Sequence, residues 1–344
     1  MSADLITITL PDGSQKQVAR GTTPLQLATG IGARLAKAAV AAKFNGQVID
    51  LNRPLEADGD FAVLTFKDPE GQEVYWHSAA HVMADAVMRV FPQAQPTIGP
   101  AIEEGFYYDF HMDRPFTEDD LARIEAEMAQ IIAADEPFAC RVATAAEAKA
   151  RDEALGNPYK VELVADIVAL ETGDEAPRGE QAIRQFEADH AADYERVQVS
   201  VYDHGNFSDL CRGPHLPSTG ALKAFKLTSS SGAYWRGSEM NPMLQRIYGI
   251  AFPDPKLLEE YLDKLEQAKA RQEDLRFEVE AATYAYENYR DSLGETDSAT
   301  IAAKQNLERY QEEYADATAE VTKLEGQVKA LQKTMQNSAD AVSK

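Results

Sequence analysis

The sequence predicts an α+β protein whose C-terminal part is entirely helical. All 16 prolines lie at or before Pro255, and only two glycines, Gly294 and Gly326, follow that residue. Proline and glycine interrupt helices, so the chain up to Pro255 should be mixed α and β structure with many turns, and the rest almost pure helix. The expected domains are 1–67, 68–252 and 253–344.

The first domain shows the pattern of a small β-grasp sheet. Residues 5–10 (LITITL) alternate apolar and polar side chains, PDG supplies a turn, and a second strand is expected near 15–18. Thr23 followed by Pro24 is a typical helix start, with threonine as the N-cap. Two more strand-like runs lie at 38–50 and 61–66. This order suits one helix held on a small sheet, an architecture that indicates no function by itself.

The second domain begins with a helical segment, HSAAHVMADAVMRVF (77–91), which should stop at Pro92. Its two histidines, His77 and His81, lie roughly 160° around the helix from the centre of its apolar stripe. They should therefore face water or a second layer of structure and not the core under the stripe. Taken alone, a His-x-x-x-His pair is more often a solvated face than a site. The stripe consists of Ala79, Met83, Ala86, Val87 and Val90.

The third domain carries two sustained heptad seams, in which apolar positions alternate steps of three and four residues. Such seams indicate a coiled coil. The first seam contains Leu258, Tyr261, Leu265, Ala268, Gln272, Leu275, Val279, Ala282, Tyr286, Tyr289 and Leu293. The second contains Ala303, Leu307, Tyr310, Tyr314, Ala317, Val321, Leu324, Val328, Leu331 and Met335.

The segment between the seams, LGETDSAT (293–300), decides how the tail is folded. Gly294 could end one helix, and Asp297 or Ser298 could cap the next, which predicts an antiparallel helical hairpin. The heptad frame also continues through Thr296 and Thr300, so one long dimerising helix is the alternative. We favour the hairpin because glycine and a capping residue are costly within a helix.

Composition narrows the class of protein. The formal net charge of −23 argues against a nonspecific nucleic-acid binder, so any RNA contact should be local and specific. Two cysteines, Cys140 and Cys211, are too few to indicate a disulfide-built fold. The N-terminal stretch MSADLITITL does not resemble a signal peptide, and no run is apolar enough to cross a membrane. The expectation is a cytoplasmic protein without membrane contact.

A second motif, CRGPH (211–215), places Cys211 and His215 four residues apart, the same spacing as His77 and His81. One thiol and three imidazoles suit a zinc site. They equally suit hydrolysis of an activated ester, because histidine exchanges protons near neutral pH. Cysteine could then be a nucleophile or a hydrogen-bond partner of the attacking water. A buried cysteine in a Gly-Pro loop explains CRGPH equally well on its own.

Five motifs occur in one order: HSAAH, IGPAIEEGFYYDF, SDLCRGPH, GAYWRGS and MLQRIYG. In this order they resemble the N-terminal half of bacterial threonyl-tRNA synthetases, and the resemblance covers about residues 1–275. Residues 1–67 resemble the TGS domain of that family, and residues from about 70 to 252 resemble its editing domain.

The resemblance implies an editing hydrolase, which removes serine wrongly esterified to the threonine tRNA and takes the acceptor end of tRNA(Thr) as its partner. Threonine exceeds serine by one methyl group, which binding alone discriminates only modestly. The implied catalytic residues are His77, His81, Cys211 and His215. The implied substrate-binding residues are Tyr108, Lys160 and Asp209, with Asp209 suited to the seryl ammonium group and Lys160 to a phosphate or a polarised oxygen. A related signature in alanyl editing proteins holds zinc, so zinc is an allowed ligand of the same four residues but not a required one.

The resemblance ends near LEQAKARQEDLRFEVEA (265–281), where the helical tail begins. No aminoacylation core is expected, and therefore no ligase activity. One interpretation is an editing factor whose tail forms a homo-oligomer or docks a partner protein. The others are a non-catalytic tRNA- or partner-binding protein and a truncated or recombined synthetase fragment.

Overall fold

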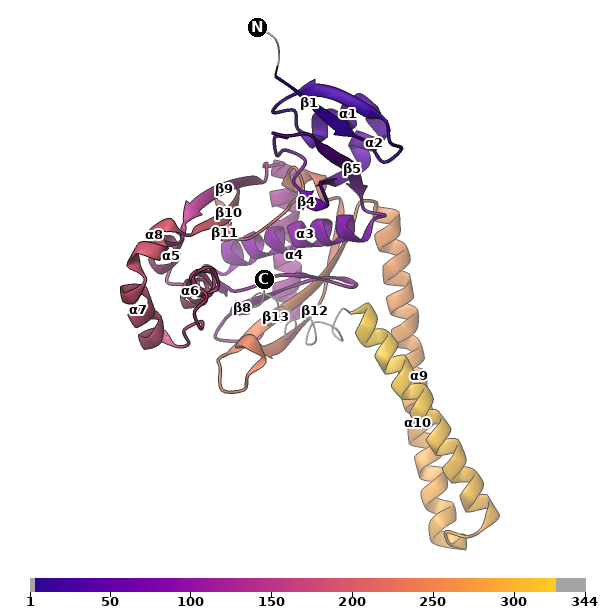
Figure 1. Cartoon of the computed structure of the whole chain (residues 1–344). Helices are drawn as coiled ribbons and strands as arrows, with labels where there is room; N and C mark the ends of the chain where they lie inside the picture. Colours follow the sequence, from indigo (N-terminus) through magenta and orange to yellow (C-terminus); the bar gives the residue numbers. More distant parts are fainter. Residues whose placement is uncertain (1–3, 326–344) are drawn as a thin grey trace.

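The computed structural model describes residues 4–325, which form mixed α+β structure followed by a C-terminal helical region (Figure 1). None of the helices in this described range is both long and apolar enough to cross a membrane.

The N-terminal segment is a five-stranded sheet in the order β2-β1-β5-β3-β4. The predicted helix start is confirmed, because Thr23 and Gln26 form a reciprocal capping box. Apolar side chains of the sheet and of α1, among them Ile8, Leu27 and Leu51, form a separate small core. The elements are β1 Leu5–Thr9, β2 Gln15–Ala19, α1 Pro24–Ile31, α2 Ala33–Ala38, β3 Ala39–Phe44, β4 Gln47–Ile49 and β5 Gly59–Thr65.

The prediction of a single strand over 38–50 is wrong, because the structure places a hairpin there. β3 and β4 pair in antiparallel register around Asn45 and Gly46, both of which have positive φ. Asn-Gly is the residue pair that a tight hairpin turn of this kind requires, since both turn residues must enter the left-handed region. The hairpin makes β4 the edge strand, and Asp50 follows it directly.

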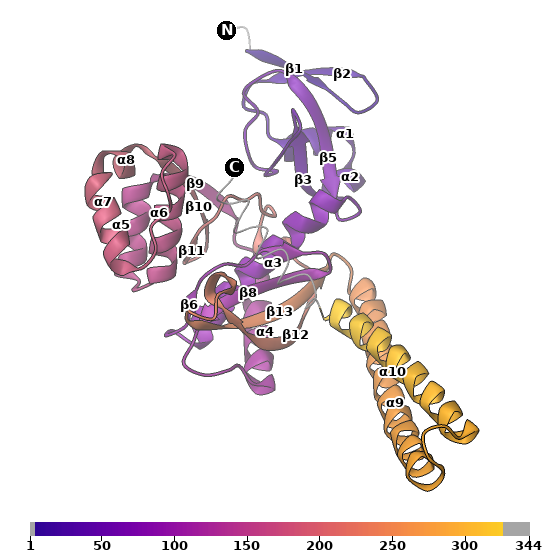
Figure 2. The same cartoon turned by 60° about the horizontal axis from the view of Figure 1, so that its bottom comes forward.

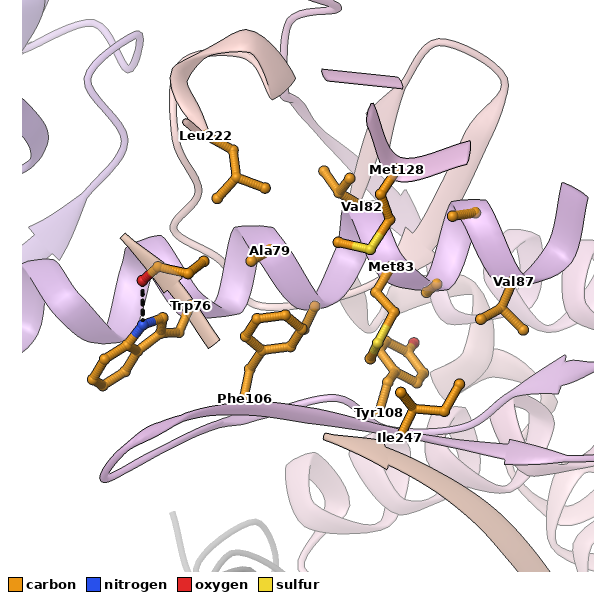
Figure 3. Packing of buried hydrophobic residues seen from close by; sticks show 14 of the residues in the cluster. Trp76, Ala79, Val82, Met83, Val87, Phe106, Tyr108, Met128, Leu222 and Ile247 are labelled. Atoms are coloured by element: carbon orange, nitrogen blue, oxygen red, sulfur yellow. Dashed lines mark hydrogen bonds between the residues drawn. The ribbon is translucent and has the colours of Figure 1, made fainter. Parts of the chain in front are cut away.

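The central helix α3 (Pro69–Val90) lies between a second sheet on one side and α4 (Glu118–Ala134) on the other (Figure 3). Phe106, Tyr108 and Ile247 contact α3 from the sheet, and Met128 and Leu222 cover the opposite face. The sheet has the order β12-β13-β8-β6, with β7 also paired to β8. Its strands are β6 Gln95–Pro96, β7 Ala101–Ile102, β8 Gly105–His111, β12 Ala224–Tyr234 and β13 Met243–Phe252.

A third sheet, β9 (Ala139–Thr144), β10 (Gln198–His204) and β11 (Phe207–Leu210), carries the helices between 145 and 196. Val164, Val168 and Val201 belong to the core that joins these helices to the sheet. This unit brings β11 and the following CRGPH loop to α3. Its helices are α5 Ala145–Ala154, α6 Pro158–Thr172, α7 Glu180–Asp189 and α8 Ala191–Arg196.

The C-terminal region consists of α9 (Pro255–Leu293) and α10 (Ser298–Leu324), which lie side by side and project from the rest of the protein (Figures 1 and 2). Gly294 follows α9 with φ 88°, and the Asp297 carboxylate caps α10 by accepting from the Ala299 amide. The Tyr261 hydroxyl donates to the Leu324 carbonyl at 2.6 Å, so the start of α9 meets the end of α10. The seam residues Val328, Leu331 and Met335 lie outside the described residues.

Candidate active site

Four side chains meet where α3 faces the CRGPH loop. The ligand-type atoms of His77, His81, Cys211 and His215 all lie within 4.8 Å of one another. The Cys211 Sγ lies 3.2 Å from the His77 Nε2 and 3.3 Å from the His215 Nε2, and it also accepts from the Gly213 amide. Residues separated by more than 130 positions in the sequence therefore form one cluster.

The orientation of His215 is fixed by Ser78, which lies between the two histidines of HSAAH. The Ser78 hydroxyl donates its one proton to the Val74 carbonyl and accepts from the Leu216 amide. The His215 Nδ1 lies 3.2 Å from the same oxygen and must therefore be the donor of that contact. This assigns the Nδ1–H tautomer to His215 and leaves its Nε2 as an unprotonated acceptor facing the Cys211 Sγ.

Burial keeps this cluster uncharged. His81 and His215 are 2% and 0% exposed, and burial lowers the pKa of both imidazoles well below the ordinary value. Burial also lowers the pKa of His77 to about 4. The pKa of the Cys211 thiol is raised, again mainly by burial. At neutral pH the site therefore presents three neutral imidazoles and a protonated thiol.

A second group of polar residues adjoins the cluster. The Lys160 Nζ lies 2.6 Å from the Asp209 Oδ1, and the Tyr108 hydroxyl donates to the Asp209 Oδ2 at 2.6 Å. The His81 Nε2 lies 3.8 Å from the same Oδ2, which links the two groups. Asp209, at the end of β11, thus faces a cation from α6 and a hydroxyl from β8.

Both groups border a cavity of about 290 Å³, which is near the lower end of the range, roughly 300–1,000 Å³, of small-molecule sites. Trp235 and Arg236, from the GAYWRGS segment, form part of its wall. Gly99 lies so close to Tyr108 that a Cβ there would overlap the phenol ring. The residues of the two polar groups that line the cavity are His77, His81, Tyr108, Lys160, Asp209 and Cys211.

The seven residues singled out from the sequence are all brought to this place. The histidines His77 and His81 were expected to face either water or a second layer of structure. They face a second layer, because the CRGPH loop and Phe207 cover this side of α3. The apolar stripe was therefore only part of the buried surface of the helix. Sequence reasoning missed Ser78 and Phe138, whose ring stacks on His215 with centroids 4.9 Å apart. The position of Ser78 within HSAAH was the available signal, whereas Phe138 gave none.

The cluster also has the donor types of a zinc site, one cysteine and three histidines. Metal-bound histidines usually donate their second ring nitrogen to a hydrogen-bond acceptor. The His81 Nδ1 is buried and has no hydrogen-bond partner among residues 4–325. A metal held at this nitrogen would leave the His81 Nε2 facing the Asp209 carboxylate, 3.8 Å away, so the donor types and their surroundings fit zinc.

Two family models match the chain. Residues 6–65 match the TGS domain, and residues 199–248 match the second additional domain of threonyl and alanyl tRNA synthetases. The second match includes the CRGPH loop, all of β12 and the first part of β13. The chain therefore carries a TGS domain and a domain of the kind found in threonyl and alanyl tRNA synthetases.

Similar proteins agree with these matches. A threonine–tRNA ligase of Pelobacter propionicus is 52% identical over 266 residues, which is 77% of this chain and 38% of the ligase. Ligases of Citrifermentans bemidjiense and Hyphomonas neptunium are 48% and 47% identical over 77% and 78% of the chain. The chain thus spans about 38% of the length of the first of these synthetases. The similarity covers the N-terminal 77% of the chain.

Proposed function

We propose that this protein hydrolyses the ester of seryl-tRNA(Thr). The observation that carries the proposal is the convergence of a thiol and two imidazoles, Cys211, His77 and His215, beside a small cavity. The editing-type domain supports a role on aminoacyl-tRNA, and the cavity suits an aminoacyl group better than a larger ligand.

The serine ammonium group enters beside Asp209, whose carboxylate already accepts from Tyr108 and pairs with Lys160. The serine ammonium group would be a further cationic partner of the Asp209 carboxylate. The site should therefore bind a substrate with a free, charged amino group better than one whose amino group is acylated. We assign Tyr108 and Lys160 to the terminal ribose and its oxygens, since both point into the same cavity.

A water held by Cys211 attacks the ester carbonyl. His77 is the imidazole that both contacts the Cys211 Sγ and lines the cavity, and its neutral form can accept the proton of that water. The water oxygen bonds to the carbonyl carbon, the bond to the ribose oxygen breaks, and the proton passes to that oxygen. The products are free serine and a tRNA ending in an intact ribose.

Cys211 is proposed to orient the water and not to attack the ester itself. A nucleophilic cysteine needs a thiolate, whereas burial raises the pKa of this thiol. The neighbouring imidazoles are neutral, so no charged partner is present in the cluster to stabilise a thiolate.

The proposal requires no metal. When bound, zinc would be held by His77, His81, Cys211 and His215 and would supply a Lewis acid. Metal analysis of the purified protein and the hydrolysis rate after chelation test this. We expect full activity in protein that holds less than about 0.1 zinc ion per chain, roughly a tenth of stoichiometric binding.

We further propose that α9 and α10 form an intramolecular coiled coil and that the domain limits are 1–67, 68–252 and 253–344. Seam positions Leu265, Leu275 and Ala317 are buried between the two helices, which supports this. Light scattering decides between a monomer and the alternative long-helix dimer or a homo-oligomer. The proposed location is the cytoplasm, where charged tRNA is found.

The deciding experiment is hydrolysis of seryl-tRNA(Thr) by the purified chain, with threonyl-tRNA(Thr) as the control substrate. Rapid loss of serine with survival of threonine is expected. His77→Ala and Cys211→Ala should each lower the rate at least about 100-fold, the scale for losing a positioned catalytic group. Asp60→Asn should change nothing, because Asp60 is exposed and is not among the residues that line the cavity. No hydrolysis by a folded protein would leave the second candidate, a tRNA- or partner-binding protein.

A further inference from the structure

One side chain of the N-terminal segment, that of Asp50, contacts the CRGPH loop directly. Asp50 follows the edge strand β4 and is held between Ile49 and Leu51, which are 4% and 0% exposed. Its carboxylate leaves this sheet and contacts residues more than 150 positions away. The Oδ1 accepts from the backbone amide of His215, and the Oδ2 accepts from the Tyr202 hydroxyl, both at 2.8 Å.

Both contacts act on the CRGPH loop. Tyr202, in β10, packs its ring edge-on against the His215 ring with centroids 4.6 Å apart. A Cβ on Gly213 would overlap the Tyr202 hydroxyl, so the loop backbone lies directly against the group that Asp50 orients. Asp50 therefore fixes the loop at two points, one at the backbone of His215 and one beneath Gly213.

We propose that Asp50 is a positioning residue of the editing reaction and that the N-terminal sheet is a structural part of the site. The inference rests on the proposed function for its catalytic consequence. Carboxylates that accept from an amide and a hydroxyl make stronger, more directional contacts than neutral acceptors. Because the His215 Nε2 lies 3.3 Å from the Cys211 Sγ, a shift of the loop displaces the thiol that orients the water.

Two possible roles of the N-terminal sheet, tRNA binding and support of the CRGPH loop, would affect different kinetic constants. A surface that only bound tRNA would change the KM for seryl-tRNA and leave kcat intact. A sheet that holds the loop changes kcat and leaves KM nearly unchanged, because Asp50 lies behind the cluster and is not among the cavity-lining residues.

The test compares Asp50→Ala and Asp50→Asn with a matched control, Asp60→Asn. Asp60 is an exposed carboxylate in β5 of the same sheet, so its neutralisation changes the charge equally. We expect kcat to fall about 10- to 100-fold in Asp50→Ala, the range for misplacing a catalytic group. The kcat of Asp50→Asn should fall less, because the oxygen of the asparagine side chain can still accept from the His215 amide. Asp60→Asn should match the unaltered protein.

A second readout does not depend on activity. Hydrogen exchange of the peptide that contains 211–216 should accelerate in Asp50→Ala and not in Asp60→Asn, because the His215 amide loses its acceptor. If the unaltered protein hydrolyses seryl-tRNA and Asp50→Ala keeps its kcat, the positioning role is overturned. If the unaltered protein is inactive, the proposed function fails, and the exchange result alone decides whether Asp50 holds the loop.

Discussion

The Ser78 hydroxyl lies 3.2 Å from the Nδ1 of His215, a residue 137 positions away. This contact sets the tautomer of the most deeply buried imidazole of the cluster, because the single Ser78 proton is already donated to the Val74 carbonyl. Consequently the unprotonated nitrogen of His215, the Nε2, faces Cys211, and the protonated Nδ1 faces Ser78 of α3.

Ser78→Ala removes the acceptor for two buried donors, the His215 Nδ1–H and the Leu216 amide. Leaving a buried donor unpaired costs about 1–3 kcal/mol, so the free energy of unfolding should fall by that amount per donor at most. The kcat for seryl-tRNA hydrolysis should fall about 10-fold or more, since His215 can then adopt either tautomer. Ser292→Ala is the control, because the Ser292 hydroxyl also donates to the carbonyl four residues earlier but lies in α9, away from the site. Equal rates for both variants would contradict the tautomer assignment.

The pH dependence follows from the lowered pKa of His77, about 4 in the folded protein. In the unfolded chain this histidine takes up a proton near pH 6.5, so between pH 6.5 and 4 the unfolded state binds the additional proton. Stability should therefore be full above pH 6.5 and decrease as the pH falls, by about 2 kcal/mol between pH 7 and 5 for His77 alone. Urea unfolding of the unaltered protein and of His77→Asn at both pH values measures this difference, and parallel pH slopes would refute it.

Hydrolysis should respond to pH differently from stability. A catalytic base with a pKa of about 4 remains unprotonated down to nearly that value, so kcat should stay level from pH 7 to about 5. A decline centred near 6.5 would mean that the base is an ordinary solvated histidine.

The Lys160–Asp209 pair is buried, with about 5% of each side chain exposed. Removing one partner leaves the other charge uncompensated, so Lys160→Met and Asp209→Asn should each lower the free energy of unfolding by about 3–5 kcal/mol. The double variant should lose less than the sum of the two, which a double-mutant cycle of urea unfolding measures. Additive losses would show that the two groups do not interact. The exposed pair Arg184–Glu180 provides a control cycle, for which at most about 0.5 kcal/mol of coupling is expected.

Gly213→Ala tests the close approach between the CRGPH loop and Tyr202. Gly213 and Gly156 have nearly the same φ, 64° and 65°, but a Cβ would overlap Tyr202 only at Gly213. Both substitutions cost backbone strain of about 1 kcal/mol, whereas only Gly213→Ala should also displace the loop and lower kcat at least about 10-fold. Measurements of kcat and of the unfolding midpoint for both variants separate the two effects; equal loss of kcat would exclude a specific role for the Tyr202 contact.

Local sequence determined the parts of this protein that depend on neighbouring residues. Thr23 with Pro24 specified the start of α1, and Gly294 with Asp297 marked the end of α9 and the start of α10, because caps and breakers act within one turn. Spacing alone singled out His77, His81, Cys211 and His215, whereas the resemblance to the synthetase family added Tyr108, Lys160 and Asp209.

Tertiary structure decided what surrounds each residue. The stripe on α3 indicated one buried face, but α4, the sheet and the CRGPH loop bury all but one of the residues from Val74 to Val87, since three separate elements pack on the helix. The tautomer of His215 depends on Ser78, and the position of its loop depends on Asp50, two residues at distant places in the chain. No periodicity or spacing encodes such pairs, because hydrogen bonds between remote segments form only once the folded core has brought those segments together.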